Sequence, residues 1–266
     1  MLDARRMPPT SDLTMNPEGT MSVPVNIVVV YHSGYGHTVK IAEAVARGAA
    51  VINSASVELV SAEQAPSRWE LLDGADAIIM GAPTYMGSLS APFKAFMDAT
   101  SHLQYAEKRW EGKIAAGFTN GASRGGDKQN SLVQLMTFAA QHQMHWVNLG
   151  MNYGNNRSYT NEDILNRDSY TLGMAGQADM DEGGEVAPPP SDLRTAEFLG
   201  RRVAEVAQEL SAGRATLGRR ANRGVSGGAD KQDPEGRGVM ASKGNRVTTG
   251  LVTAEASRDP LPISEG

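Results

Sequence analysis

The chain has 266 residues, of which 40% are hydrophobic and 21% charged, values that are ordinary for a globular protein with a buried core. Its net charge of -5 provides no basic surface for nucleic acid or for an anionic membrane. It contains no cysteine, which excludes disulfides, thiolate metal sites and a cysteine nucleophile, so redox chemistry here would need a cofactor.

The two ends of the chain differ in composition from its middle. Residues 1–22 are polar and contain three prolines, which predicts a flexible leader, with Met21 as an alternative start. Residues 214–266 are rich in glycine, charge and small polar residues, which predicts a disordered tail; a poorly patterned accessory subdomain is the alternative. We therefore expect one domain over residues 23–213.

The N-terminal residues lack the apolar core of a signal peptide, and no apolar run is long enough to span a membrane. These features predict a cytoplasmic protein without a membrane partner.

Strand and helix patterns alternate through the middle of the chain. Continuous apolar runs rich in β-branched residues predict buried parallel strands, and apolar residues at helical spacing predict helices. The predicted elements are a strand at 25–31, a helix at 38–50, strands at 56–60 and 75–81, a helix at 90–100, a strand at 113–119, a helix at 128–142, a strand at 145–149 and a helix at 191–211. This alternation predicts a doubly wound α/β fold, a parallel sheet with helices on both faces that binds ligands beyond the carboxyl ends of its strands.

A glycine loop joins the first predicted strand to the first predicted helix. Its residues are Ser33, Gly34, Tyr35, Gly36, His37 and Thr38. Amides at a helix start favour a phosphate, and glycines let the backbone approach it. The loop lacks the ending of a Walker A motif, and Val39 stands where the dinucleotide fingerprint has its third glycine. The loop alone predicts either a phosphate site or a tight turn without a ligand.

Two further loops follow the third and fourth predicted strands, at residues 82–88 (APTYMGS) and 119–126 (TNGASRGG). Both lie at the edge of the sheet that carries the glycine loop. Each combines glycine with polar or planar side chains, which suits a flat ring that needs apolar faces and hydrogen bonds on its rim.

These three loops, in this order and spacing, resemble those of the flavodoxin superfamily, and most closely the tryptophan-repressor-binding-protein family of NAD(P)H:quinone oxidoreductases. The resemblance covers about residues 25–212 and is carried by SGYGHT, GAPTYMGSLSAPFKAFMD and TNGASRGG. It implies a flavodoxin-like five-stranded parallel sheet in the order 2-1-3-4-5, FMN as the cofactor and NAD(P)H as the electron donor. A small-molecule quinone would be the acceptor, and the protein would be a homodimer or homotetramer.

The resemblance also assigns residues to the cofactor. The six residues of the glycine loop would hold the FMN phosphate. The isoalloxazine would be lined on one side by Pro83, Thr84, Tyr85, Met86 and Gly87, and on the other by Thr119, Asn120, Gly121, Ala122, Ser123 and Gly125. His142 matches the family's histidine near the flavin of a neighbouring subunit, and His142 and Tyr85 are the candidates for positioning substrate. The chain departs from the family at Tyr85 and Met86, where the family has Arg-Phe, and in the loop at 150–190.

Three functions remain open at this stage. In the first, reduced nicotinamide reduces the flavin, which passes two electrons to a quinone. The others are a non-catalytic flavodoxin that carries electrons between proteins, and an interaction protein that has lost its flavin. Mild acidity and few aromatic residues in the flavin loops favour the enzyme over the carrier. The spacing of His, Asp and Glu predicts no metal site.

Overall fold

The computed structural model describes residues 14–15 and 21–218. The leader predicted for residues 1–22 and the tail predicted for 214–266 therefore fall largely outside the described residues. Inside them, β1 (Thr14–Met15) and β2 (Met21–Ser22) pair antiparallel.

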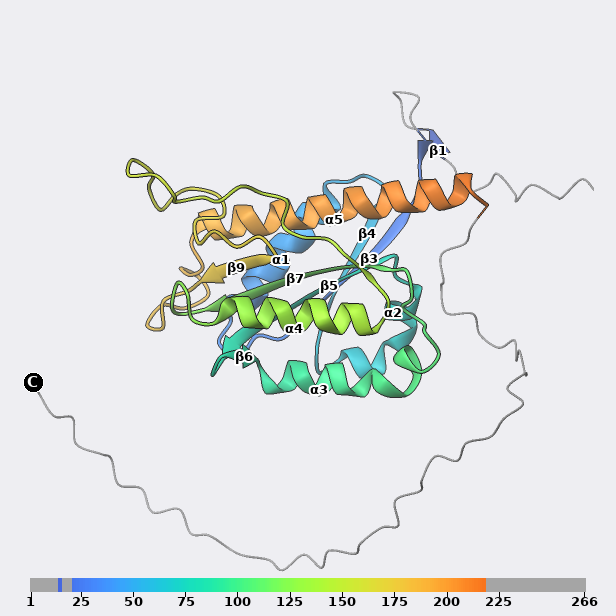
Figure 1. Ribbon diagram of the computed structural model, residues 1–266, viewed down its shortest axis with the longest axis horizontal. Helices are drawn as coiled ribbons and strands as arrows, with labels where there is room; N and C mark the ends of the chain where they lie inside the picture. Colours follow the sequence, from blue (N-terminus) through green and yellow to red (C-terminus); the bar gives the residue numbers. More distant parts are fainter. Residues whose placement is uncertain (1–13, 16–20, 219–266) are drawn as a thin grey trace, which may run out of the picture. The chain divides into compact units, whose positions relative to one another are not determined.

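A parallel sheet forms the centre of the domain (Figure 1). In spatial order its strands are β4 (Ala55–Ser61), β3 (Val25–Tyr31), β5 (Ala77–Tyr85), β7 (Ile114–Gly121) and β8 (His145–Trp146). Two short strands are added to this path: β6 (Ser88–Leu89) pairs antiparallel with β5, and β9 (Met174–Gln177) pairs parallel with β7. The order confirms the doubly wound sheet and the 2-1-3-4-5 arrangement.

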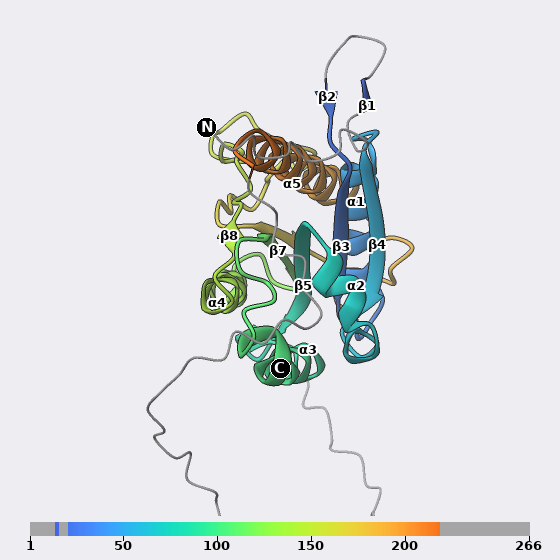
Figure 2. The same ribbon diagram turned by 90° about the vertical axis from the view of Figure 1, so that its right-hand side faces the viewer.

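Alternate residues of the central strands feed two cores. Ile27 and Val29 of β3 face the first core, which is covered by α1 (His37–Ala50) and α5 (Pro190–Thr216). Val28 and Val30 face the second core, which is covered by α2 (Trp69–Gly74), α3 (Ala91–Ala99) and α4 (Lys128–Gln141). Figure 2 shows α1 and α5 together on one side of the strands, with α3 and α4 on the other. Burial on both faces explains why these strands read as continuous apolar runs.

Helices α1 and α5 cross with their backbones in contact. A Cβ placed on Gly200 would overlap the carbonyl oxygen of Val45, and one placed on Gly48 would overlap that of Glu197. Only glycine fits at either position. This close packing fixes α1, and with it the glycine loop at the start of α1, against the rest of the domain.

The structure corrects the predicted strand at 145–149. Only His145 and Trp146 join the sheet there, opposite Ile114 and Ala115. The chain then leaves the sheet and returns at Met174, opposite Phe118. The fifth position of the sheet is therefore shared by two short strands, with an insertion at residues 147–173 between them.

Several element bounds also differ from the prediction. β5 continues to Tyr85 and β7 to Gly121, so parts of the two predicted loops are strand ends. α5 continues to Thr216, beyond the predicted end of the domain. A 3₁₀ turn (Ala65–Ser67), α2, β6 and a π-helical turn, η3 (Ser101–Tyr105), have no counterpart among the predicted elements.

Candidate functional site

The glycine loop leads directly from β3 into α1. Gly36 precedes the helix with φ 88°, in the left-handed region that glycine adopts without strain. Ser33 Oγ accepts a hydrogen bond from the amide of Val39 at 3.1 Å. The amides of His37 and Thr38 precede the first intrahelical bond, and the first turn of α1 contains no acidic residue. The loop thus offers backbone amide donors to an anion, and the first turn of α1 has no acidic side chain that would repel it.

A segment far along the chain packs against this loop. His37 Nε2 lies 2.7 Å from the carbonyl oxygen of Glu182, and because a carbonyl only accepts, Nε2 carries the proton. A Cβ on Gly184 would lie 2.8 Å from the carbonyl oxygen of Gly36. Residues 182–184 therefore form one wall of the glycine loop, which the sequence did not predict.

Tyr85 joins the second loop to the first. A Cβ on Gly34 would lie 2.6 Å from Tyr85 Oη, and the rings of Tyr35 and Tyr85 meet edge to face with centroids 6.1 Å apart. Burial, together with the neighbouring Tyr35, raises the pKa of Tyr85, while a hydrogen bond from the Gly34 backbone opposes this. The phenol is therefore protonated at neutral pH. Met86, the next residue, is fully exposed.

A chain of hydroxyl groups fixes the ends of β5 and β7. Thr119 donates to the carbonyl oxygen of Ala82 at 2.7 Å, so Thr84, 2.8 Å from Thr119, must donate to it. Ser131, 2.7 Å from Thr84, must in turn donate to Thr84. Every proton of this chain is used within the protein. Thr84 and Thr119 therefore order the two strand ends, and neither has a proton left for a ligand.

Asn120 is the polar residue of the third loop that has an unused atom. Its side chain is buried, and Oδ1 has no hydrogen-bond partner within the described part of the chain. A buried acceptor without a donor is costly and indicates a place for a ligand's donor. FMN offers donors on its ring and ribityl chain and a phosphate for the open amides of α1. The residues present at this edge therefore fit FMN.

The structure brings together the predicted cofactor-binding residues at one edge of the sheet, which we term the carboxyl edge. It carries the ends of β3, β5 and β7, and it lies toward the side of Figure 1 where β6 and β9 are drawn. The opposite edge, where these strands begin, is termed the amino edge.

His142 lies at the amino edge, apart from the other predicted site residues. It follows the last residue of α4, a 14-residue helix that begins at the carboxyl edge and spans about 20 Å. The ring is 3% exposed, packs 4.7 Å from Trp110 and from Phe138, and hydrogen-bonds Thr100 at 2.9 Å. Burial lowers the pKa of His142 to about 4. The ring is thus remote from the flavin loops of its own subunit, and contact with a neighbour's flavin stays a prediction that its enclosure does not favour.

Lys128, at the start of α4, belongs to this region although the sequence does not single it out. Its side chain is fully buried, and Nζ donates to Asp168 Oδ2 at 2.9 Å and to the carbonyl oxygen of Gly176 at 3.0 Å. Burial lowers the pKa of Lys128, and Asp168 opposes this effect. Lysine at a polar helix start gives no sequence signal of burial.

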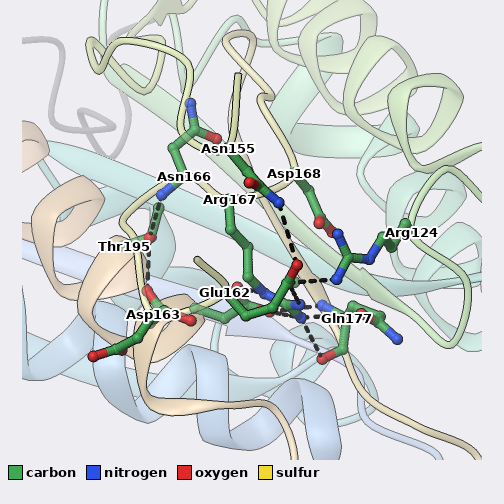
Figure 3. Close-up of polar contacts among 12 residues, drawn as sticks. Arg124, Asn155, Glu162, Asp163, Asn166, Arg167, Asp168, Gln177 and Thr195 are labelled. Carbon is green, nitrogen blue, oxygen red and sulfur yellow. Dashed lines mark hydrogen bonds and ion pairs between the residues drawn. The ribbon is translucent and has the colours of Figure 1, made fainter. Parts of the chain in front are cut away.

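Arg167 is a second buried cation without a sequence signal. Its guanidinium donates to both carboxylate oxygens of Asp192, at 2.8 and 3.1 Å, and also reaches Glu162 and Gln177 (Figure 3). Burial alone would lower the pKa of Arg167, but the Asp192 carboxylate raises it above its ordinary value. The insertion is thereby tied to the start of α5 and the end of β9.

Among the residues described, no group of three or more His, Asp or Glu side chains could hold a metal ion. No helix in the described ranges is both long and apolar enough to cross a membrane.

Comparison with known proteins agrees with this geometry. Residues 38–155 match the family described as NADPH-dependent FMN reductase. The chain is 43% identical to flavodoxin FldP of Pseudomonas aeruginosa over 70% of this chain and 98% of that protein. It is 31% identical to an NAD(P)H dehydrogenase (quinone) of Paracoccus denitrificans, over 71% of this chain and 97% of that protein.

A solved structure gives the same result. The flavodoxin, WrbA-like protein of Agrobacterium tumefaciens is 39% identical, with a TM-score of 0.54, and the match covers 70% of this chain and 98% of that one. The sheet order and the three loops define a flavodoxin-like protein. The chain belongs to the WrbA family of flavodoxin-like proteins.

Proposed function

We propose that the protein is an FMN-dependent oxidoreductase that passes electrons from NAD(P)H to a quinone. One observation carries the proposal: the carboxyl edge offers open amides at the start of α1 together with the unpaired acceptor of Asn120 among the described residues. These groups complement the phosphate and the donors of FMN. The relatives named NAD(P)H dehydrogenase (quinone) support the choice of donor and acceptor.

FMN, when bound, supplies the chemistry of accepting a hydride and releasing two electrons. The chain's own groups bind and orient. The glycine loop holds the phosphate through backbone amides and the hydroxyl of Ser33, without lysine or arginine. Asn120 Oδ1 accepts a hydrogen bond from the ring or the ribityl chain.

Tyr85 is the residue that we propose for positioning substrate. Its ring borders both the first and the second loop, and its raised pKa keeps the phenol a hydrogen-bond donor at neutral pH. The proton that reduction of a quinone by NAD(P)H takes up would come from solvent, because His142 of the same subunit lies at the opposite edge of the sheet and is not placed to supply it.

We place this activity in a cytoplasmic homodimer or homotetramer with no nucleic-acid partner. The exposed side chains of Leu103 and Tyr105, both on η3, support a subunit contact. Light scattering of the purified protein measures the number of subunits, and a monomer would contradict this part of the proposal.

The decisive experiment follows NADPH and NADH oxidation by the FMN-reconstituted protein, with and without benzoquinone. Turnover that needs both flavin and quinone is expected. Tight FMN binding without reduction by either nicotinamide would favour the second candidate, an electron carrier, which the relative named flavodoxin FldP supports. A protein that binds no FMN would contradict both functions.

A further inference from the structure

Within the third loop, residues 121–125 rest on the side chains of Lys128 and Tyr170. A Cβ on Gly121 would lie 3.5 Å from Cγ of Lys128, so the lysine stem supports the end of β7. The Lys128 ammonium group then binds the carbonyl oxygen of Gly176 in β9 and the carboxylate of Asp168. One side chain thus joins β7, β9 and the insertion.

Tyr170 supports the other end of the same loop. Its hydroxyl donates to the carbonyl oxygen of Gly125 at 2.9 Å, and its ring lies 5.5 Å from Lys128 Nζ. The cation over the ring contributes to holding the two side chains together. Lys128 and Tyr170 thus contact the loop near Gly121 and Gly125, and Asp168 holds the Lys128 ammonium group; we term these three residues the loop platform.

Two further residues of the insertion, Asn166 and Arg167, hold the loop platform in place. Asn166 Oδ1 accepts the amide of Tyr170 at 3.0 Å, and Asn166 Nδ2 donates to the carbonyl oxygens of Asn152 and Tyr170. Arg167 is fixed by its two hydrogen bonds to Asp192. Figure 3 shows Asn166, Arg167 and Asp168 on this segment. The platform is thus ordered by the protein itself.

Stability alone is a weak reason for such a platform. The attraction within a buried ion pair offsets little more than the free energy of desolvating its two charges. An apolar pair of similar volume often stabilises the fold at least as much. The position of this pair is informative. A Cβ on Gly176 would lie 3.1 Å from Asn120 Oδ1, so the carbonyl that Lys128 holds belongs to the residue next to the unpaired acceptor. Asp168 Oδ1 is likewise buried without a partner in the described structure.

We propose that Lys128, Asp168 and Tyr170 are positioning residues that set the third loop and Asn120 for the ring and ribityl side of FMN. This inference rests on the proposed function. The platform supports the third loop and not the glycine loop, so its loss should weaken FMN and riboflavin, which lacks the phosphate, by the same factor.

The test uses the full-length apo protein and three variants. Lys128→Met removes the cation, and Asp168→Asn keeps the shape of the partner while removing its charge. Arg109→Met is the matched control, because it breaks an ion pair with Asp73 (3.0 Å) at the amino edge. Flavin fluorescence gives the Kd for FMN and for riboflavin, the absorption bands of bound flavin report the ring environment, and thermal melts report stability.

We expect Lys128→Met and Asp168→Asn to raise both Kd values about tenfold and to shift the flavin bands, while Arg109→Met lowers only the Tm. Unchanged Kd values in the two platform variants would overturn the inference, as would an equal rise in the control. If Lys128→Met does not fold, Asp168→Asn decides. A wild-type protein that binds neither flavin overturns the proposed function, and the platform inference with it.

Discussion

Both edges of the sheet bury a lysine and an aspartate, but the groups that surround these residues differ. At the amino edge, Lys113 Nζ donates to the carbonyl oxygens of Asp73 and Ala75, at 2.6 and 2.5 Å. The Asp73 carboxylate accepts hydrogen bonds from Trp110 and Arg109. At the carboxyl edge, a second buried lysine, Lys128, supports a loop beside open amides and an acceptor that has no partner among the described residues.

The amino edge also contains an unpaired buried atom within the described structure, Nδ1 of His142. Aromatic rings surround this histidine, however, and the glycine loop lies at the other edge. A buried polar atom without a partner therefore indicates a ligand site only where nearby backbone amides also lack a hydrogen-bond partner. Changes at the amino edge should alter stability, and changes at the carboxyl edge should alter flavin binding.

The largest effect is expected for Lys113→Met. Two buried carbonyl groups lose a donor, so we expect the free energy of unfolding to fall by about 3 kcal/mol while the FMN Kd stays unchanged. Urea denaturation and flavin fluorescence measure the two quantities. The control is Lys94→Met, a solvent-exposed lysine on α3, for which a change within about 0.5 kcal/mol is expected. Weaker FMN binding by Lys113→Met would contradict the claim that the amino edge affects stability and not flavin binding.

Ser33→Glu tests the other edge. A carboxylate in the glycine loop repels the FMN phosphate, so the Kd for FMN should rise about 100-fold, equivalent to about 2.7 kcal/mol. Riboflavin lacks the phosphate and should bind within about threefold of wild type. Ser33→Ala separates the loss of the hydroxyl from the added charge. Equal weakening of both flavins would place the phosphate elsewhere.

His142 should make the amino edge sensitive to acid. Its folded pKa of about 4 lies below the unfolded value of 6.5, so the unfolded state takes up the proton first as pH falls. The contribution to stability is complete above pH 6.5 and is lost toward pH 4, by about 2 kcal/mol between pH 7 and pH 5. His142→Phe should remove this part of the pH dependence in urea denaturation of the apo protein. An identical pH profile in the variant would contradict the assignment.

The smallest effect is expected for Tyr85→Leu. Loss of an aromatic ring beside the flavin should raise the Kd for FMN and for riboflavin by about tenfold, equivalent to about 1.4 kcal/mol. Tyr35→Leu is the matched control, since Tyr35 is 78% exposed, and it should change either Kd less than Tyr85→Leu does. The reverse ranking would assign the flavin contact to Tyr35.

Most of the fold could be predicted because a strand buried on both faces is a continuous apolar run, which can be recognised in the sequence without knowing its partners. The strand at Val25–Tyr31 has the bounds that its apolar run predicts, and α4 differs by one residue at its end. The split fifth position was not predictable in this way, because Met174–Gln177 joins the sheet only through its partner strand. Apolar periodicity does not contain that information.

The candidate site could be predicted only in part. Glycine loops at strand ends are visible in sequence, so the three loops are found by inspection. The enclosure of His142 is not visible in the sequence, because matching a histidine to a family position says nothing about its burial. The loop platform has no sequence signal because Lys128 and Asp168 are 40 residues apart and follow no periodic pattern.

The split fifth position also shows how a sheet can take up an addition. Trp146 lies opposite Ala115 and Met174 opposite Phe118, so only Ala116 and Gly117 of β7 separate the two registers. A linker of two residues from Trp146 to Met174, matching those two positions, would complete an uninterrupted fifth strand. The chain from Trp146 to Met174 therefore leaves and rejoins the sheet along one strand, β7, so the whole insertion is accommodated while the order of the other strands is kept.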